Sequence, residues 1–190
     1  MQRFIPLLLL AVWCMPMVAV VDAHIGFELN GTHRFEYHGQ STDFDSSGSI
    51  ALGVELFDQS NRFCYGIGME YIAPRTLDAY DYSEVQYNYL ALHGIAKYSL
   101  TKPEKWPAVL LVGHLGPSFY FANRGYRRLL NGKVWDTTAG LYGAFGCELA
   151  PQGRFVFSGL FRLVGGALQY DGKHMRVTQT NFALRVGYRL

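Results

Sequence analysis

The sequence predicts an all-β protein, an eight-stranded antiparallel up-and-down transmembrane β-barrel, and three observations support this prediction. The 190-residue chain opens with a segment typical of exported proteins. Beyond it, apolar residues recur at every second position in eight separate segments. The connections between these segments alternate between short and long, as in barrels of the outer membrane.

The composition excludes two other classes of protein. Hydrophobic residues make up 49% of the chain and charged residues 17%, which is too apolar for a disordered chain. The formal net charge is only +2, whereas a dedicated nucleic-acid binder carries a basic stripe. The length fits one domain.

Residues 1–23 are predicted to form a cleaved signal peptide. Arg3 precedes an apolar run over residues 4–21, and a Val-Asp-Ala sequence then supplies a small residue for cleavage. The alternative is a membrane anchor, because the run approaches the spanning length, but Pro16 interrupts it. Residues 24–190 are therefore expected to form an outer-membrane β-barrel domain.

The eight alternating segments define the expected strands and their connections. The segments are 25–37, 50–56, 63–71, 90–100, 109–121, 141–149, 155–163 and 182–190. Short turns are expected at 58–62, 101–107 and 150–154, and long polar loops at 38–48, 73–84, 122–137 and 165–177. With this rhythm both ends of the barrel domain lie on the short-turn side.

The two faces of the strands differ in a way that favours a lipid-facing barrel. One face is Leu, Ile, Val, Phe and Tyr throughout, whereas the other mixes small residues with charges. The charged residues on this second face are Glu28, Arg34, Glu55, Glu70, Lys97, Glu148, Arg162, Arg185 and Arg189. A soluble barrel turns its apolar face inward, but a membrane barrel turns it toward lipid and encloses the polar face.

Charges enclosed in so narrow a barrel must be paired, because an isolated buried charge is costly. We expect a polar network in the lumen, and counting from the strand ends predicts two pairs within it, Glu28 with Arg185 and Glu70 with Arg162. The residues assigned to this network are Glu28, Glu70, Glu148, Arg162, Arg185 and Arg189. The same parity turns Cys64 inward and Cys147 outward, which disfavours a disulfide between them.

Aromatic residues cluster near the expected strand ends, where the two membrane–water interfaces would lie. The residues are Phe63, Tyr65, Tyr71, Tyr98, Phe119, Phe121, Phe155 and Tyr188. The alternative explanation is the general preference of aromatic residues for strands.

The last strand carries the most specific resemblance. Its sequence, Phe182-Ala-Leu-Arg-Val-Gly187-Tyr188-Arg-Leu190, resembles the terminal signal that the barrel-assembly machinery reads in small outer-membrane barrels of the OmpA/OmpX-like type. The family usually ends in Phe, whereas this chain ends in Leu190. The Gly-rich segment 142–149 also resembles the family. The resemblance implies insertion into the outer membrane of a Gram-negative-type cell, with long loops on the outer face.

The charges of the predicted loops suggest a second site. The first two loops are acidic and the last two are basic, so the loops either pair with one another or bind phosphate groups of lipopolysaccharide. The basic residues are Arg124, Arg127, Arg128, Lys133, Lys173 and Arg176. Any further surface ligand is not identified by the sequence.

The expected role is structural or surface-interacting, without catalysis, cofactor or metal. A conducting pore is not expected, because side chains fill an eight-stranded lumen. One alternative is a lipid-modifying enzyme: the first loop groups His38 with Ser41 and Asp43, and His114 with Ser118 loosely resembles a lipid A deacylase pair. The other histidines considered are His33, His93 and His174. A secreted lipocalin-like carrier is the second alternative.

Overall fold

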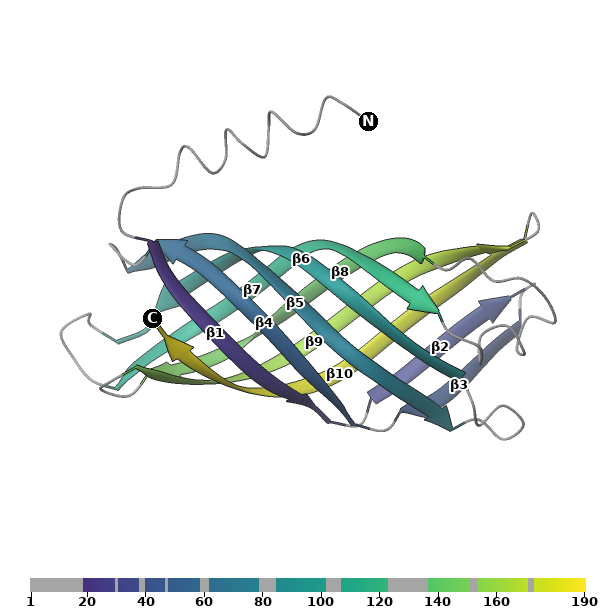
Figure 1. The fold of residues 1–190 in the computed structure, drawn as a ribbon, viewed down its shortest axis with the longest axis horizontal. Coiled ribbons are helices and arrows are strands. Elements are labelled where there is room, and N and C mark those ends of the chain that lie inside the picture. Colours follow the sequence, from purple (N-terminus) through teal and green to yellow (C-terminus); the bar gives the residue numbers. More distant parts are fainter. Residues whose placement is uncertain are drawn as a thin grey trace, which may run out of the picture.

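Eight antiparallel strands close into a barrel in a computed structural model of the protein (Figure 1). The structure describes residues 19–29, 31–37, 40–46, 48–58, 62–78, 85–101, 107–122, 137–150, 154–170 and 173–190. Within these residues we find no helix with the length and apolar character needed to cross a bilayer.

The strands follow one another around the wall, so the topology is up-and-down as predicted. In pairing order they are β1 (Ala19–Glu28), β4 (Ser49–Asp58), β5 (Phe63–Asp78), β6 (Val85–Ser99), β7 (Ala108–Ala122), β8 (Thr137–Ala150), β9 (Phe155–Tyr170) and β10 (Lys173–Arg189). The wall closes where β1 pairs with β10, from Asp22 opposite Arg189 to Glu28 opposite Ala183. Closure pairs each of these eight strands with a neighbour on both sides, which avoids the open edges that hydrocarbon would penalise.

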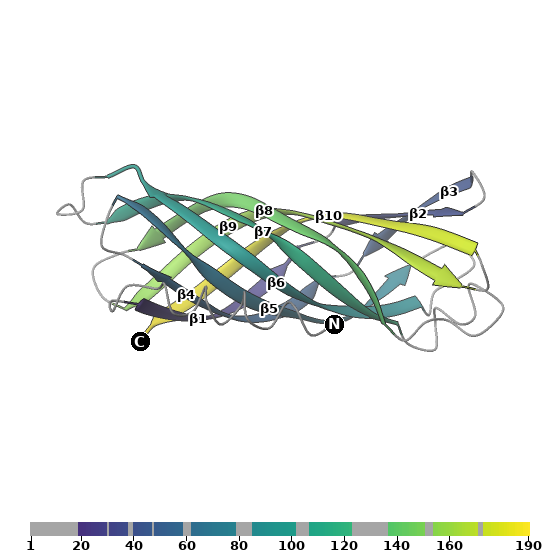
Figure 2. The same cartoon turned by 90° about the horizontal axis from the view of Figure 1, so that it is seen from above.

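The strand predicted at 25–37 is divided into the end of β1 and a separate strand, β2 (Gly31–Tyr37). β2 forms a hairpin with β3 (Gln40–Ser46), which replaces part of the loop predicted at 38–48. It projects at the end of the barrel opposite the C-terminus (Figures 1 and 2). β2 pairs with the start of β10, and β3 touches the end of β5. β2 begins at Gly31, where a Cβ would lie 2.2 Å from the carbonyl oxygen of Thr180.

Arg34 corrects the expectation that every charge on its parity faces the lumen. It lies on the hairpin, more than half exposed, and its guanidinium donates two hydrogen bonds to Asp43 at 2.8 and 3.0 Å. These bonds lower the pKa of the Asp43 carboxyl. The prediction was wrong because the pairing register with β10 shifts by one residue at the break, from Glu28 opposite Ala183 to Thr32 opposite Thr180. Arg34 therefore stands opposite the exposed Thr178 and takes the outward direction.

The strands also run further toward the long-loop side than predicted. Residues 73–78, 165–170 and 173–177 belong to β5, β9 and β10 and not to loops. In β5 the pairing register shifts between Ile72 and Arg75, a stretch that includes Pro74. Proline has no N–H to give to the ladder, so it is confined to edges and irregularities of this kind.

The two faces of the wall have the polarity that the sequence predicts. Leu52, Ile67 and Leu184 are 52%, 43% and 51% exposed on the outer surface, whereas Glu70 and Arg185 are 0% and 5% exposed inside. The aromatic residues predicted near the strand ends, such as Phe63 and Phe155, also face outward. At the short-turn end, Arg154 donates a hydrogen bond to the Tyr188 hydroxyl at 3.2 Å. An apolar exterior around an ionic interior is the arrangement of a lipid-facing barrel.

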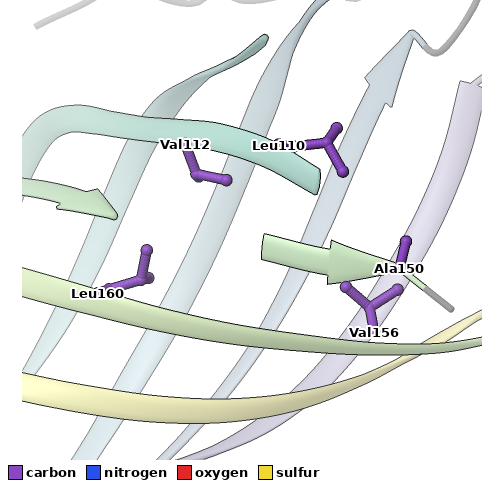
Figure 3. Packing of buried hydrophobic residues seen from close by; sticks show 5 residues of the cluster. All are labelled: Leu110, Val112, Ala150, Val156 and Leu160. Atoms are coloured by element: carbon purple, nitrogen blue, oxygen red, sulfur yellow. The ribbon is translucent and has the colours of Figure 1, made fainter. Parts of the chain in front are cut away.

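The lumen is less polar than predicted, because one part of it holds a dry cluster. The side chains of Leu110, Val112, Ala150, Val156 and Leu160 pack together inside β7, β8 and β9 (Figure 3). This cluster explains why the run 108–112 is apolar at every position: one face meets the exterior and the other meets the cluster.

The cysteines and a glycine show how the wall is fitted together. Cys64 is buried inside and Cys147 is exposed outside, as parity predicts, and the two do not form a disulfide with each other. A Cβ on Gly146 would lie 1.9 Å from the carbonyl oxygen of Gly159, so two strands approach closely there only because residue 146 has no side chain.

Candidate functional site

Arg162 on β9 joins two carboxylates inside the barrel. Its Nη1 donates to Oε1 of Glu28 at 2.6 Å, and its Nη2 donates to Oε1 of Glu70 at 2.5 Å. The Tyr89 hydroxyl also donates to Glu28, at 3.1 Å, and the Tyr142 hydroxyl donates to Glu70 at 3.2 Å. All five residues are 0% exposed, so the protein itself replaces the water that these charges would otherwise bind.

A second ionic group lies around Lys97 on β6. Its Nζ is 2.9 Å from Oε2 of Glu55 and 2.8 Å from Oε2 of Glu148. Arg185 on β10 donates from Nη2 to Oε1 of Glu55. One ammonium group therefore holds two carboxylates from opposite parts of the wall.

Arg189 and Asp22 extend this group toward the short-turn end. The guanidinium donates from Nε and Nη2 to the two Asp22 oxygens, each at 2.9 Å, and Nη2 lies 3.7 Å from Glu148. Such a two-pronged pair is stronger and more directional than a single contact.

His24 connects the two groups. Its Nε2 lies 3.3 Å from Oε1 of Glu70, and its Nδ1 lies 3.2 Å from Nη2 of Arg185. A guanidinium can only donate, so Nδ1 accepts and Nε2 carries the proton that goes to Glu70. We name the whole series the ionic ladder; its members are Glu28, Arg162, Glu70, His24, Arg185, Glu55, Lys97, Glu148, Arg189 and Asp22.

Of the two predicted pairs, Glu70 with Arg162 is confirmed and Glu28 with Arg185 is wrong. Glu28 binds Arg162, and Arg185 binds Glu55. In the wall Glu28 stands opposite Ala183, two residues from Arg185. Strands of a barrel are staggered, so equal counts from strand ends do not give equal depth.

Sequence reasoning left Asp22 and His24 out of the lumen and named Glu55 and Lys97 only as inward charges. Asp22 was missed because it lies inside the predicted signal peptide, and β1 begins at Ala19 in the structure. Cleavage after Ala23 would remove Asp22 and leave Arg189 with Glu148 at 3.7 Å. The parity of His24, shared with Glu28, was the signal that could have placed it inside.

The predicted loop patch falls mostly outside the described residues. This applies to Arg124, Arg127, Arg128 and Lys133. Arg176 is exposed on β10, and Lys173 opens that strand. The proposed assembly signal lies at the other end of β10, with Phe182, Tyr188 and Leu190 exposed and Gly187 buried.

The catalytic alternative has little geometric support. The Ser118 hydroxyl is buried and has no hydrogen-bond partner in the described part of the chain. The His114 ring instead stacks on His93, with ring centroids 4.4 Å apart, and its Nε2 lies 3.5 Å from Glu55. His38 lies outside the described residues.

Comparisons with known proteins give a fold and no close relative. No protein-family model and no curated protein matches the chain significantly. Among solved structures, it resembles the attachment invasion locus protein Ail of Yersinia pestis in complex with the heparin analogue sucrose octasulfate, with 16% identity, a TM-score of 0.52, and coverage of 92% of this chain and 100% of that one.

Two other outer-membrane structures match in the same way. They are Neisserial surface protein A (11% identity, TM-score 0.52, 90% of this chain and 97% of that one) and OprG from Pseudomonas aeruginosa (10%, 0.51, 90% and 95%). At such low identity the likeness concerns architecture alone. With its closed wall and inverted polarity, the protein has the fold of the small eight-stranded outer-membrane β-barrels.

Proposed function

We propose that the protein is an integral outer-membrane barrel, exported by a cleaved signal peptide of residues 1–23, with a non-enzymatic structural or surface-interaction role. The observation that carries this proposal is the polarity of the wall: Leu52 and Leu184 are about half exposed while Arg162 is fully buried. Exposing these apolar side chains to water is unfavourable, whereas contact with acyl chains is favourable. A lipocalin-like carrier would need the opposite polarity.

The filled lumen supports a role on the outer surface over one inside the barrel. The ionic ladder and the apolar cluster of Leu110, Val112, Ala150, Val156 and Leu160 occupy the interior with side chains. A lipid substrate has no route to His114 there, which favours a non-enzymatic role. The surface for interaction is then the long-loop end, where the barrel strands and the β2–β3 hairpin emerge (Figure 1).

The partner that best fits this end is a saccharide bearing phosphate or sulfate groups, such as lipopolysaccharide. The arginines of the ionic ladder form ion pairs with carboxylates inside the barrel, and Arg34 forms an ion pair with Asp43. The basic residues that the sequence assigns to the outer face, Arg127 and Arg128 among them, are our candidates for binding such an anionic ligand. The complex of Ail with a sulfated heparin analogue supports this chemistry on a barrel of the same fold.

Replacing Arg127 and Arg128 together by alanine is expected to weaken polyanion binding about tenfold, since exposed ionic contacts contribute up to about 1 kcal/mol each. Binding would be measured by calorimetry on the barrel in phosphatidylcholine nanodiscs, with a heparin fragment in one arm and purified lipopolysaccharide in the other. Raised salt should weaken both interactions.

The matched control is Arg154→Ala, which removes an exposed arginine at the short-turn end and should leave both affinities unchanged. Loss in only one arm assigns the patch to that ligand. Equal affinities for the double variant and the unmodified protein, in both arms, would exclude the patch as a polyanion site.

A further inference from the structure

Three buried side chains from three strands gather beside the ionic ladder. They are Glu55 on β4, His93 on β6 and His114 on β7, and one potential ligand atom from each lies within 4.8 Å of the other two. Glu55 is 1% exposed and each histidine is 4% exposed. We call this group the His/Glu cluster.

The two histidines lack the partners that buried polar groups normally have. None of their four ring nitrogens has a hydrogen-bond partner among the described residues. A buried donor or acceptor without a hydrogen bond is costly, so these four ring nitrogens call for an explanation. Their rings stack on each other, 17° from parallel, and the His93 ring also lies 5.2 Å from the Tyr142 ring.

Two imidazoles and one carboxylate are a familiar donor set for Zn²⁺ with one position left open. Two ligand atoms of a tetrahedral zinc ion are about 3.4 Å apart, given metal–ligand bonds of about 2.0–2.2 Å. Nε2 of His114 and Oε1 of Glu55 are 3.5 Å apart, so this pair already has the required spacing. His93 completes the set if its ring turns out of the stack and aims one nitrogen at the same point.

A glycine in the wall makes room for this arrangement. Gly68 on β5 pairs with Glu55 on one side and with His93 on the other. A Cβ at residue 68 would lie 2.5 Å from Nε2 of His93. The imidazole therefore reaches over β5 toward the carboxylate only because residue 68 has no side chain.

We infer that Glu55, His93 and His114 form a binding site for one divalent transition-metal ion inside the barrel, with Zn²⁺ as the reference ion. Lys97 and Arg185 also pair with Glu55, and their positive charges repel the proposed metal ion. A carboxylate offers about four lone-pair positions, so Glu55 can give one to the metal and keep these pairs. The site is separate from the loop surface and does not depend on the proposed function.

The packing of the lumen determines how the metal enters. Buried side chains occupy the space around the His/Glu cluster, including Tyr142 and the ladder residue Lys97, which are 0% and 1% exposed. A metal site needs an entry path, and these buried side chains leave none evident among the residues that the structure describes. The ion is therefore expected to bind while the barrel folds.

The test is to refold the full barrel from urea into detergent with Zn²⁺ present, remove free metal with a chelator, and count bound zinc by atomic emission. We expect about one zinc ion per unmodified barrel and a loss of roughly tenfold in His93→Gln and in His114→Gln, because each removes one ligand. Refolding with Co²⁺ should give the visible absorption of a tetrahedral complex.

The matched control is His33→Gln on β2, a histidine that is not a member of the His/Glu cluster, and this variant should bind zinc as the unmodified protein does. Heat-modifiable gel migration identifies which variants have folded, and only folded protein is counted. Zinc absent from the folded unmodified barrel, or present equally in the two cluster variants, would overturn the inference.

Discussion

Arg162→Met is expected to lower the free energy of unfolding by about 3–5 kcal/mol, the cost of leaving a buried charge without its partner. Arg162 donates to both Glu28 and Glu70, and all three side chains are fully buried. Methionine fills much of the same space but offers neither carboxylate a charge. Urea unfolding in phospholipid vesicles, followed by tryptophan fluorescence, measures the change.

Two further variants separate charge from packing. Arg154→Met makes the same substitution at an exposed position and should change stability by at most about 1 kcal/mol. Adding Glu28→Gln and Glu70→Gln to Arg162→Met neutralises the stranded carboxylates and should recover part of the loss. A triple variant less stable than Arg162→Met alone would show that the ion pair is not the source of the effect.

Ile67→Arg is also expected to lower the free energy of unfolding strongly, because it places a charge on the lipid-facing surface. Ile67 lies outward on β5 midway between Phe63 and Tyr71, aromatic residues near the two ends of the apolar belt. Arginine at the bilayer midplane of a membrane barrel costs about 2–4 kcal/mol, falling to about 0–1 kcal/mol near the interface. The unfolding free energy in vesicles should fall by the larger amount.

Leu100→Arg is the matched control, since Leu100 is similarly exposed but follows the end of β6 at the short-turn side. Its expected cost is about 0–1 kcal/mol. Equal costs at the two positions would mean that depth along the wall has no effect, and so that lipid does not surround it.

The wall of this barrel could be predicted from sequence because the direction of side chains along a strand alternates strictly. That rule alone placed Glu55, His93 and His114 inside and Ile67 and Cys147 outside, as the structure has them. It needs no knowledge of which strand pairs with which.

Partners within the lumen could not be predicted in the same way. Whether Arg185 meets Glu28 or Glu55 depends on the stagger between strands, which a two-residue period does not contain. The His/Glu cluster joins residues 55, 93 and 114, whose separations resemble no short metal-binding motif. The strand β3 was missed because its residues, Gln40–Ser46, are polar apart from Phe44 and show no apolar alternation.

The native cysteines offer the most direct test of the central claim that apolar side chains face lipid and polar ones are enclosed. Variants keeping only Cys64 or only Cys147 would be spin-labelled in membranes, and their collisions with lipid-soluble oxygen and with a water-soluble nickel complex compared. Cys147 should label readily and favour oxygen, whereas Cys64 should resist labelling until the barrel unfolds. Ready labelling of Cys64, with Cys147 shielded or favouring the nickel complex, would contradict this account.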